Sequence, residues 1–105
     1  MKPIDLNRAR VARRQYLLSK HAADQMIRRE ITAVETEEAV RGSSEVIEDY
    51  PSEKYGPSCL ILGYTGSGRA LHLHCSYPES DPVKIVTVYE SDPSRWTDLR
   101  VRRRG

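Results

Sequence analysis

Two histidines and a cysteine stand almost side by side in the stretch GRALHLHCSYP, as His72, His74 and Cys75. An imidazole titrates near neutral pH, so it can take up or release a proton during catalysis. Imidazoles and thiolates are also the usual ligands of zinc. The stretch is therefore a candidate for a catalytic surface or a metal site, and the alternative is that it is simply one strand of a sheet.

The elements that must position these residues indicate an α+β fold. Ser19 is a good helix N-cap, and Thr32 with Glu35 forms a capping box. The spacing predicts a short basic helix over 4–14 and two more helices over 20–30 and 32–42. From residue 45 the pattern changes to alternation and β-branched residues, which predicts four strands at 45–50, 58–64, 69–77 and 83–90. We expect N-terminal helices packed on a four-stranded antiparallel sheet.

The hydrophobic pattern also predicts how the strands pair. A four-residue turn at 65–68 pairs Leu62 with Leu71 and Leu60 with Leu73, so the leucines form the core face. If the next turn pairs Val86 with Cys75, Thr87 pairs with His74 and Tyr89 with His72, and Cys75 points toward the core. The residues that we expect on the opposite, open face are Cys59, Ile61, His72, His74, Thr87 and Tyr89.

A metal site is the weaker alternative for this face. His74 and Cys75 are neighbours in a strand and point to opposite faces, so they cannot easily bind one ion. His72, His74 and Cys59 share the open face, but the chain has no CxxC or HExxH motif, and zinc usually needs three or four well-placed ligands. We predict no metal and no cofactor.

Size and composition limit the other possibilities. With 105 residues the chain is long enough for one domain, and we expect 1–105 to be a single domain with a basic N-terminal helix or arm at 1–15 and a basic tail at 97–105. No apolar run approaches the roughly 18 residues of a membrane span, and the N-terminus lacks the apolar region of a secretory signal. A cytoplasmic location with reduced cysteines is expected.

The charges are unevenly distributed along the chain. Residues 1–29 carry eight Lys and Arg against two Asp, residues 30–53 carry eight Asp and Glu against one Arg, and residues 54–105 are basic again. Thirteen of the basic residues are Arg, which binds phosphate or carboxylate with two hydrogen bonds. This profile allows a nucleic-acid surface at the chain ends, and ordinary solvated surface is the alternative.

Five stretches of the chain carry a family resemblance: SKHAADQMIRREIT, IEDYP, YGPSCLILGYT, GRALHLHCSYP and VKIVTVYE. Together, over about residues 16–96, they resemble the family called domain of unknown function 4258. That family is similar to the RelE/ParE-like superfamily of small bacterial toxins, which includes messenger-RNA interferases. The resemblance implies a RelE/ParE-like fold, and a toxin-like component of a toxin–antitoxin pair whose partner is a zinc-finger antitoxin.

The resemblance also implies roles for individual residues. His21 falls on the most characteristic polar position of the family and becomes the first candidate for the base or acid of a metal-independent ribonuclease. Arg28 and Arg29 fall on its arginine-rich helix end and would hold the RNA phosphate. Further candidates are His72, His74 and Tyr89 for catalysis and Lys84 for substrate binding.

Several of these residues also have a structural explanation. For His21, near the start of its helix, the alternative is a structural role in which the ring binds a backbone carbonyl. His21 also lies on a helix while the other histidines lie on a sheet face, so one centre that contains all three is doubtful. Arg28 and Arg29 also suit the dipole at a helix C-terminus as solvated charges. The alternative function is a non-catalytic module of the same fold that binds protein or nucleic acid.

Overall fold

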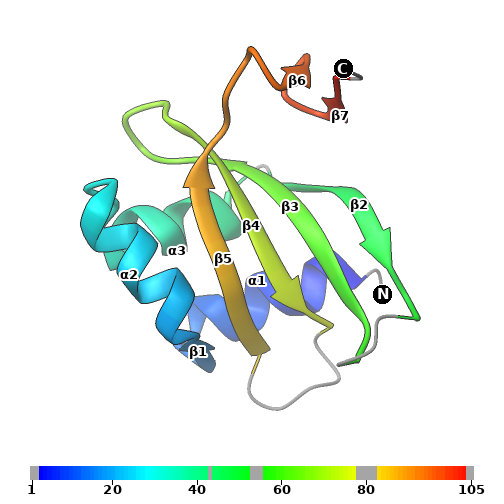
Figure 1. Cartoon of the computed structure of the whole chain (residues 1–105). Coiled ribbons are helices and arrows are strands. Elements are labelled where there is room, and N and C mark those ends of the chain that lie inside the picture. The colour runs from blue at the N-terminus through cyan, green and yellow to red at the C-terminus, as the bar shows by residue number, and fades with distance from the viewer. Residues whose placement is uncertain (1–2, 43, 53–55, 78–82, 104–105) are drawn as a thin grey trace.

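The computed structural model describes residues 3–42, 44–52, 56–77 and 83–103. Three helices lie against one face of a five-stranded sheet, and a two-stranded ribbon follows β5 (Figure 1). The predicted α+β class is confirmed. The predicted turn at 78–82 lies outside the described residues, as do 1–2, 43, 53–55 and 104–105. The described elements are α1 Pro3–Ala12, β1 Tyr16–Leu18, α2 Lys20–Arg28, α3 Ala33–Arg41, β2 Glu45–Tyr50, β3 Ser58–Tyr64, β4 Ala70–Ser76, β5 Val83–Glu90, β6 Trp96–Thr97 and β7 Val101–Arg102.

Local signals position the helices as predicted. The Ser19 hydroxyl accepts a hydrogen bond from the Ala22 N–H (3.0 Å) and begins α2. At α3, the Thr32 hydroxyl accepts from the Glu35 N–H, and the Glu35 carboxylate accepts from the Thr32 N–H, so the capping box is complete. Each bond satisfies a backbone donor that a helix start would otherwise leave unpaired.

The sheet contains a strand that the sequence did not predict. Its order is β1-β5-β4-β3-β2, and β1 runs parallel to β5 while the other pairs are antiparallel. The prediction of four antiparallel strands is therefore wrong in number and in one direction. Ser19 anchors β1, because its N–H donates to the Ile85 carbonyl and its hydroxyl to the Val86 carbonyl. A strand of three residues is too short to show the alternation that reveals longer ones.

The register between β3 and β4 differs from the prediction by one residue. Tyr64 pairs with Ala70. The Thr65 N–H donates to the Arg69 carbonyl (2.9 Å), which closes a three-residue loop where four residues were expected. Gly68 lies in this loop with φ +90°, as a glycine does in the common three-residue hairpin loop. A shift of one residue moves every side chain of β3 to the other face.

The shift places Cys59 and Ile61 toward the helices, so the prediction that they share the open face with the histidines is wrong. Leu60 and Leu62 pair with His74 and His72 instead. The predicted pairing between β4 and β5 is confirmed for His72 with Tyr89 and for His74 with Thr87; a bulge after His74 pairs Cys75 with Ile85 where Val86 was expected.

The core between the helices and the sheet explains this register. Gly63 faces α3, and a Cβ atom there would lie 2.1 Å from the Ala39 carbonyl oxygen. Only a residue without a side chain allows the helix to pack this closely on β3. The buried core residues are Val11, Ala22, Met26, Ile31, Ala39, Val40, Cys59, Ile61, Leu71, Leu73, Cys75, Val83, Ile85 and Val88.

The C-terminal segment 91–103 folds back over the predicted open face. The Trp96 ring meets the His72 ring edge-on at 4.4 Å. Arg100 forms an ion pair with Glu45 (2.6 Å), and Arg102 forms one with Glu48 (2.9 Å). These contacts tie the basic tail to the acidic strand β2, so the two blocks of opposite charge in the sequence meet on this face.

Candidate functional site

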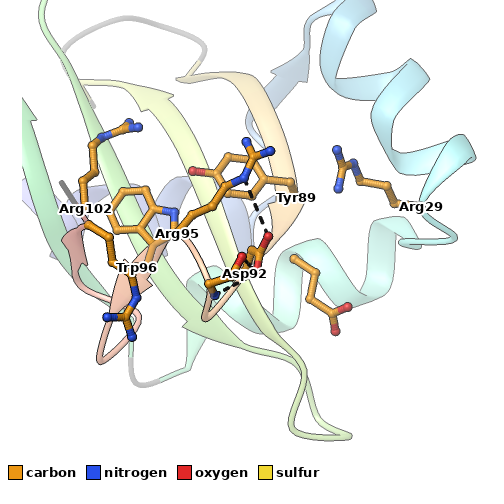
Figure 2. Close-up of a pocket in the computed structure, with 9 residues that line it drawn as sticks. Arg29, Tyr89, Asp92, Arg95, Trp96 and Arg102 are labelled. Carbon is orange, nitrogen blue, oxygen red and sulfur yellow. Dashed lines mark hydrogen bonds and ion pairs between the residues drawn. The ribbon is translucent and has the colours of Figure 1, made fainter. Parts of the chain in front are cut away.

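A cleft of about 880 Å³ lies where the end of β5 meets the C-terminal segment and the end of α2. Figure 2 shows that the arginines approach it from both sides, with Tyr89 between them. Two aromatic rings and four guanidinium groups line it, which suits an anionic and partly aromatic ligand. Its lining residues are Arg29, Tyr89, Glu90, Asp92, Ser94, Arg95, Trp96, Arg102 and Arg103.

The four arginines differ in how firmly they are held. Arg102 binds Glu48 and stacks its guanidinium 4.7 Å from the centre of the Trp96 ring. Arg103 donates to the Pro93 carbonyl (3.0 Å), and Arg95 lies 3.7 Å from the Asp92 carboxylate. The fourth arginine, Arg29, lies at the C-cap of α2.

Arg29 is the least engaged cation of the cleft. Its side chain forms no ion pair with any carboxylate in the part of the chain that the structure describes. Figure 2 shows its guanidinium directed from the end of α2 toward Tyr89. A phosphate that enters the cleft would therefore find a guanidinium that need not break an ion pair first.

Tyr89 and His72 form a hydrogen-bonded pair behind the cleft. The His72 Nε2 lies 2.7 Å from the Leu99 carbonyl oxygen, which can only accept, so Nε2 carries the proton. The neutral ring then accepts the Tyr89 O–H at Nδ1 (3.2 Å). His72 is fully buried and both of its nitrogens are bonded within the protein. Of the pair, only Tyr89 lines the cleft.

Burial shifts the pKa of both members of this pair. It lowers the pKa of His72 against the opposing effect of the Leu99 carbonyl, so His72 is neutral at pH 7. It raises the pKa of Tyr89, so this phenol is protonated. A neutral imidazole that accepts from a protonated phenol is the arrangement in which a proton can pass from Tyr89 to His72.

His74 lies one pair further along β4, outside the cleft lining. Its Nε2 is 2.8 Å from the Ser58 hydroxyl, and its ring meets the Tyr50 ring edge-on at 5.6 Å. The side chain is partly exposed. His74 shares a sheet face with His72, as predicted, but it faces Thr87 and β3 rather than the arginines.

The remaining predicted residues, His21, Arg28 and Lys84, lie outside the cleft lining. His21 is exposed in the first turn of α2, eight residues from Arg29, which is about 12 Å along a helix. Arg28 is exposed next to Arg29 but does not line the cleft. Lys84 lies five residues from Tyr89 along β5, about 16 Å away. Of the predicted residues, the structure thus brings together Arg29 and Tyr89 at the cleft, with His72 behind them.

No group of three or more His, Cys, Asp or Glu side chains in the described ranges could hold a metal ion. The two cysteines pair across β3 and β4 and are buried as free thiols. Burial raises the pKa of Cys59 to about 11 and also raises that of Cys75, so both are protonated and poor nucleophiles.

The sequence reading missed the contribution of the C-terminal segment to the site. Arg95, Trp96, Arg102 and Arg103 all line the cleft, and none was named as a site residue. The available signal was the single tryptophan of the chain next to an arginine-rich tail, whose charge is opposite to that of the acidic block at 30–53. Periodicity alone could not indicate which face this segment would cover.

The comparisons with known proteins identify a family and no activity. Residues 18–90 match the family described as "Domain of unknown function (DUF4258)". The curated proteins gave no match, and neither did the solved structures. The match ends at Glu90, so six of the nine cleft residues lie beyond it. Because the match covers most of the sequence, from the end of β1 to the end of β5, the chain belongs to the DUF4258 family.

Proposed function

We propose that this protein binds RNA in the arginine cleft, as the toxin-like component of a bacterial toxin–antitoxin pair. The observation that carries the proposal is the convergence of four arginines on a cleft that Tyr89 lines, with Arg29 unpaired among the described residues. Guanidinium groups bind phosphates with two hydrogen bonds, and aromatic or guanidinium planes stack on unpaired bases. Single-stranded RNA offers both partners together.

The charge of the cleft favours this ligand. Its lining holds four arginines against Glu90 and Asp92, and Glu48 neutralises only Arg102. A surplus of positive charge in a recess raises the local concentration of an anion and speeds its association. Among the described helices, none has the length and hydropathy of a membrane span. The toxin-like role and the zinc-finger antitoxin rest on the family resemblance.

The test of RNA binding is its salt dependence. Each arginine that neutralises a phosphate of single-stranded RNA contributes about 0.7 to the slope of log K against log salt concentration. We expect Arg29→Gln to reduce this slope by about that amount. Arg28→Gln is the matched control, because it removes the same charge one residue away, outside the cleft lining. Equal losses in the two variants would contradict a site in the cleft.

A second candidate function is metal-independent cleavage of the bound RNA, and the Tyr89–His72 pair favours it. The 2′-hydroxyl proton would pass to the Tyr89 oxygen while the Tyr89 proton passes to Nδ1 of His72. The 2′-oxygen would then attack phosphorus, the bond to the 5′-oxygen would break, and that oxygen would take a proton from water. The hydroxide that remains would take the proton of Tyr89, which recovers its own proton from His72. Arg29 and Arg95 would stabilise the negative charge of the phosphorane.

Cleavage is tested with purified RNA and with induced expression in bacteria, where growth and RNA integrity are followed. We expect Tyr89→Phe to abolish cleavage and His21→Ala to retain it. Loss of cleavage in a folded His21→Ala protein would place the reaction on α2 and refute the Tyr89 pathway. Wild-type protein that binds RNA and leaves it intact would be the non-catalytic binding module. Relief of growth arrest by the protein encoded beside it tests the antitoxin.

A further inference from the structure

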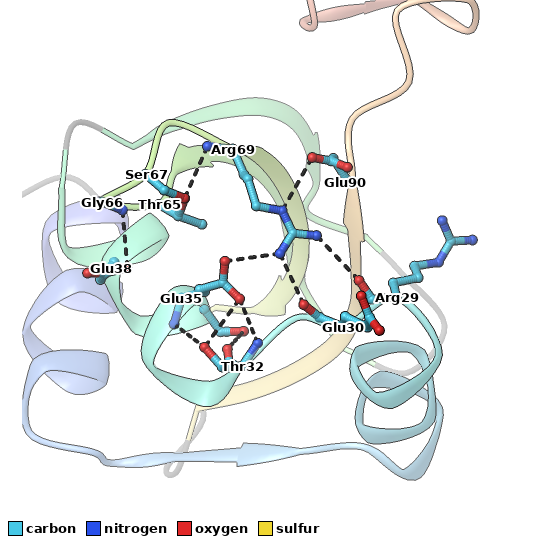
Figure 3. Close-up of polar contacts among 11 residues, drawn as sticks. Arg29, Glu30, Thr32, Glu35, Glu38, Thr65, Gly66, Ser67, Arg69 and Glu90 are labelled. Atoms are coloured by element: carbon cyan, nitrogen blue, oxygen red, sulfur yellow. Dashed lines mark hydrogen bonds and ion pairs between the residues drawn. The ribbon is translucent and has the colours of Figure 1, made fainter.

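Arg69 lies outside the cleft lining and binds four groups with one guanidinium (Figure 3). Its Nη1 donates to the Glu35 carboxylate (3.0 Å) and to the Glu30 carbonyl (3.1 Å), and its Nη2 donates to the Arg29 carbonyl (3.3 Å). Its Nε donates to the Glu90 carboxylate (3.3 Å). The guanidinium therefore joins the β3–β4 hairpin to the end of α2, the start of α3 and the end of β5.

The backbone at the end of α2 holds the Arg69 guanidinium in a fixed position. Glu30 adopts a left-handed conformation (φ +53°), its N–H bonds to the Ile27 carbonyl, and the Ile31 N–H bonds to the Met26 carbonyl. This pair of bonds is a Schellman motif, which leaves the carbonyls of Arg29 and Glu30 free to accept from a side chain. Arg69 takes both carbonyls, so its guanidinium is held by backbone atoms as well as by carboxylates.

The contacts of Arg69 determine which cation the Glu90 carboxylate pairs with. It lines the cleft beside Arg29, and its side chain is about half exposed. One guanidinium touches both the Glu90 carboxylate and the Arg29 backbone, so these two residues lie within a side chain's length of each other. A Glu90 released from Arg69 would be free to pair with Arg29 and compete with a phosphate for it.

The second acid of the cleft has its own partners. The Asp92 carboxylate accepts from the Ser94 N–H (2.9 Å) and hydroxyl (2.7 Å), and it lies 3.7 Å from Arg95. Local bonds therefore hold Asp92, whereas Glu90 depends on a residue from the hairpin. We infer that Arg69 is a positioning residue of the RNA site, which sequesters Glu90 and thereby keeps Arg29 available for phosphate.

This inference rests on the proposed RNA site and is tested by a double-mutant cycle. The variants are Arg69→Gln, Glu90→Gln and the double variant, and the probes are a single-stranded RNA oligonucleotide and inorganic pyrophosphate at low salt. Gln at position 69 retains an amide N–H₂ for the helix carbonyls and loses the ion pair. Circular dichroism and thermal melting establish that each variant is folded.

We expect Arg69→Gln to weaken binding of both probes about threefold to fivefold, the strength of an exposed ion pair between Glu90 and Arg29. In the Glu90→Gln background the same change should cost less than about 1.5-fold, because no carboxylate remains to compete. Equal effects in both backgrounds would overturn the inference, because they would show that Arg69 acts only through its own charge or through the fold.

Arg69→Lys keeps the inference testable if Arg69→Gln does not fold. Lys can still pair with Glu90 but cannot bind both helix carbonyls, so the melting temperature should fall while affinity for pyrophosphate stays within about 1.5-fold. A loss of affinity that Glu90→Gln does not relieve would overturn the inference. Wild-type protein that binds pyrophosphate but not RNA would refute the proposed function alone, and one that binds neither probe would refute both.

Discussion

Gly63→Ala tests the register of β3 and β4, on which the position of every side chain in the site depends. In the observed register Gly63 faces α3, and a Cβ atom there would lie 2.1 Å from the carbonyl oxygen and 2.6 Å from the carbonyl carbon of Ala39. Real Cβ atoms essentially never approach closer than 3.0 Å. Backbone atoms cannot rotate away, so α3 and β3 must separate by almost 1 Å.

The cost follows from the packing that this separation disturbs. Forcing an extra methyl group into a packed core typically costs about 1–3 kcal/mol. Because Ala39 and the adjacent Val40 are both fully buried, we expect a loss near 3 kcal/mol in the free energy of unfolding. For a domain of this size each kcal/mol lowers the melting temperature by about 4–8 °C, so the variant should melt roughly 12–24 °C below wild type.

Gly66→Ala is the matched control for this experiment. Its Cβ would meet only the carboxylate end of Glu38, 2.8 Å away, which is a flexible side chain that can turn aside. We expect a change within about 0.5 kcal/mol. In the alternative register, Gly63 points away from the helices, and Gly63→Ala would be neutral or stabilising. A Gly63→Ala protein that melts with wild type would therefore refute the observed register and the packing of α3 on β3.

Three further predictions concern stability. Glu30→Gly should raise the free energy of unfolding, measured by urea titration, by up to about 1 kcal/mol, because glycine adopts the left-handed conformation of Glu30 without strain. Glu30→Ala, which keeps a Cβ atom, should give no gain in the same titration. Because burial lowers the pKa of His72, the folded protein binds fewer protons than the unfolded chain, so stability should be retained above about pH 6.5 and lost as the pH falls below it. His72→Gln should remove this part of the pH dependence of the urea midpoint of unfolding. If the midpoint of the variant falls below pH 6.5 as steeply as that of wild type, His72 is not the buried neutral group that causes the loss. Ser19→Ala should cost about 2 kcal/mol in thermal melting, because the hydroxyl caps α2, which contributes about 1 kcal/mol, and also donates to the Val86 carbonyl, which contributes about as much again. A loss of about 1 kcal/mol or less would show that the second bond adds nothing.

Local signals in the sequence were sufficient for the helices. Ser19 and the Thr32–Glu35 pair satisfy donors within three residues of themselves, so their effect does not depend on the rest of the chain. The strands were recognised for the same reason, since alternation and β-branching describe a segment by itself. The pairing of His72 with Tyr89 also followed, because the hydrophobic pattern of β4 and β5 allows it.

The site was only partly predictable. Arg29 and Tyr89 were named as candidates, and they meet at the cleft. His21, His72 and His74 were each candidates for the acid or base, but the C-terminal segment buries His72, while His74 and His21 lie outside the cleft lining. A histidine in a sequence carries no sign of what will cover it, because Trp96 and Leu99, which bury and bond His72, are more than 20 residues away.

By itself, then, the sequence determined the α+β class, the three helices with the caps that begin two of them, four of the strands and the presence of basic and acidic blocks. Only the tertiary structure decided the register of β3, the pairing of β1 with β5 and the return of the C-terminal segment over the sheet. The physical reason is that these depend on contacts between distant residues. Gly63 must meet Ala39, and Arg102 must meet Glu48, before one arrangement becomes more stable than its alternatives.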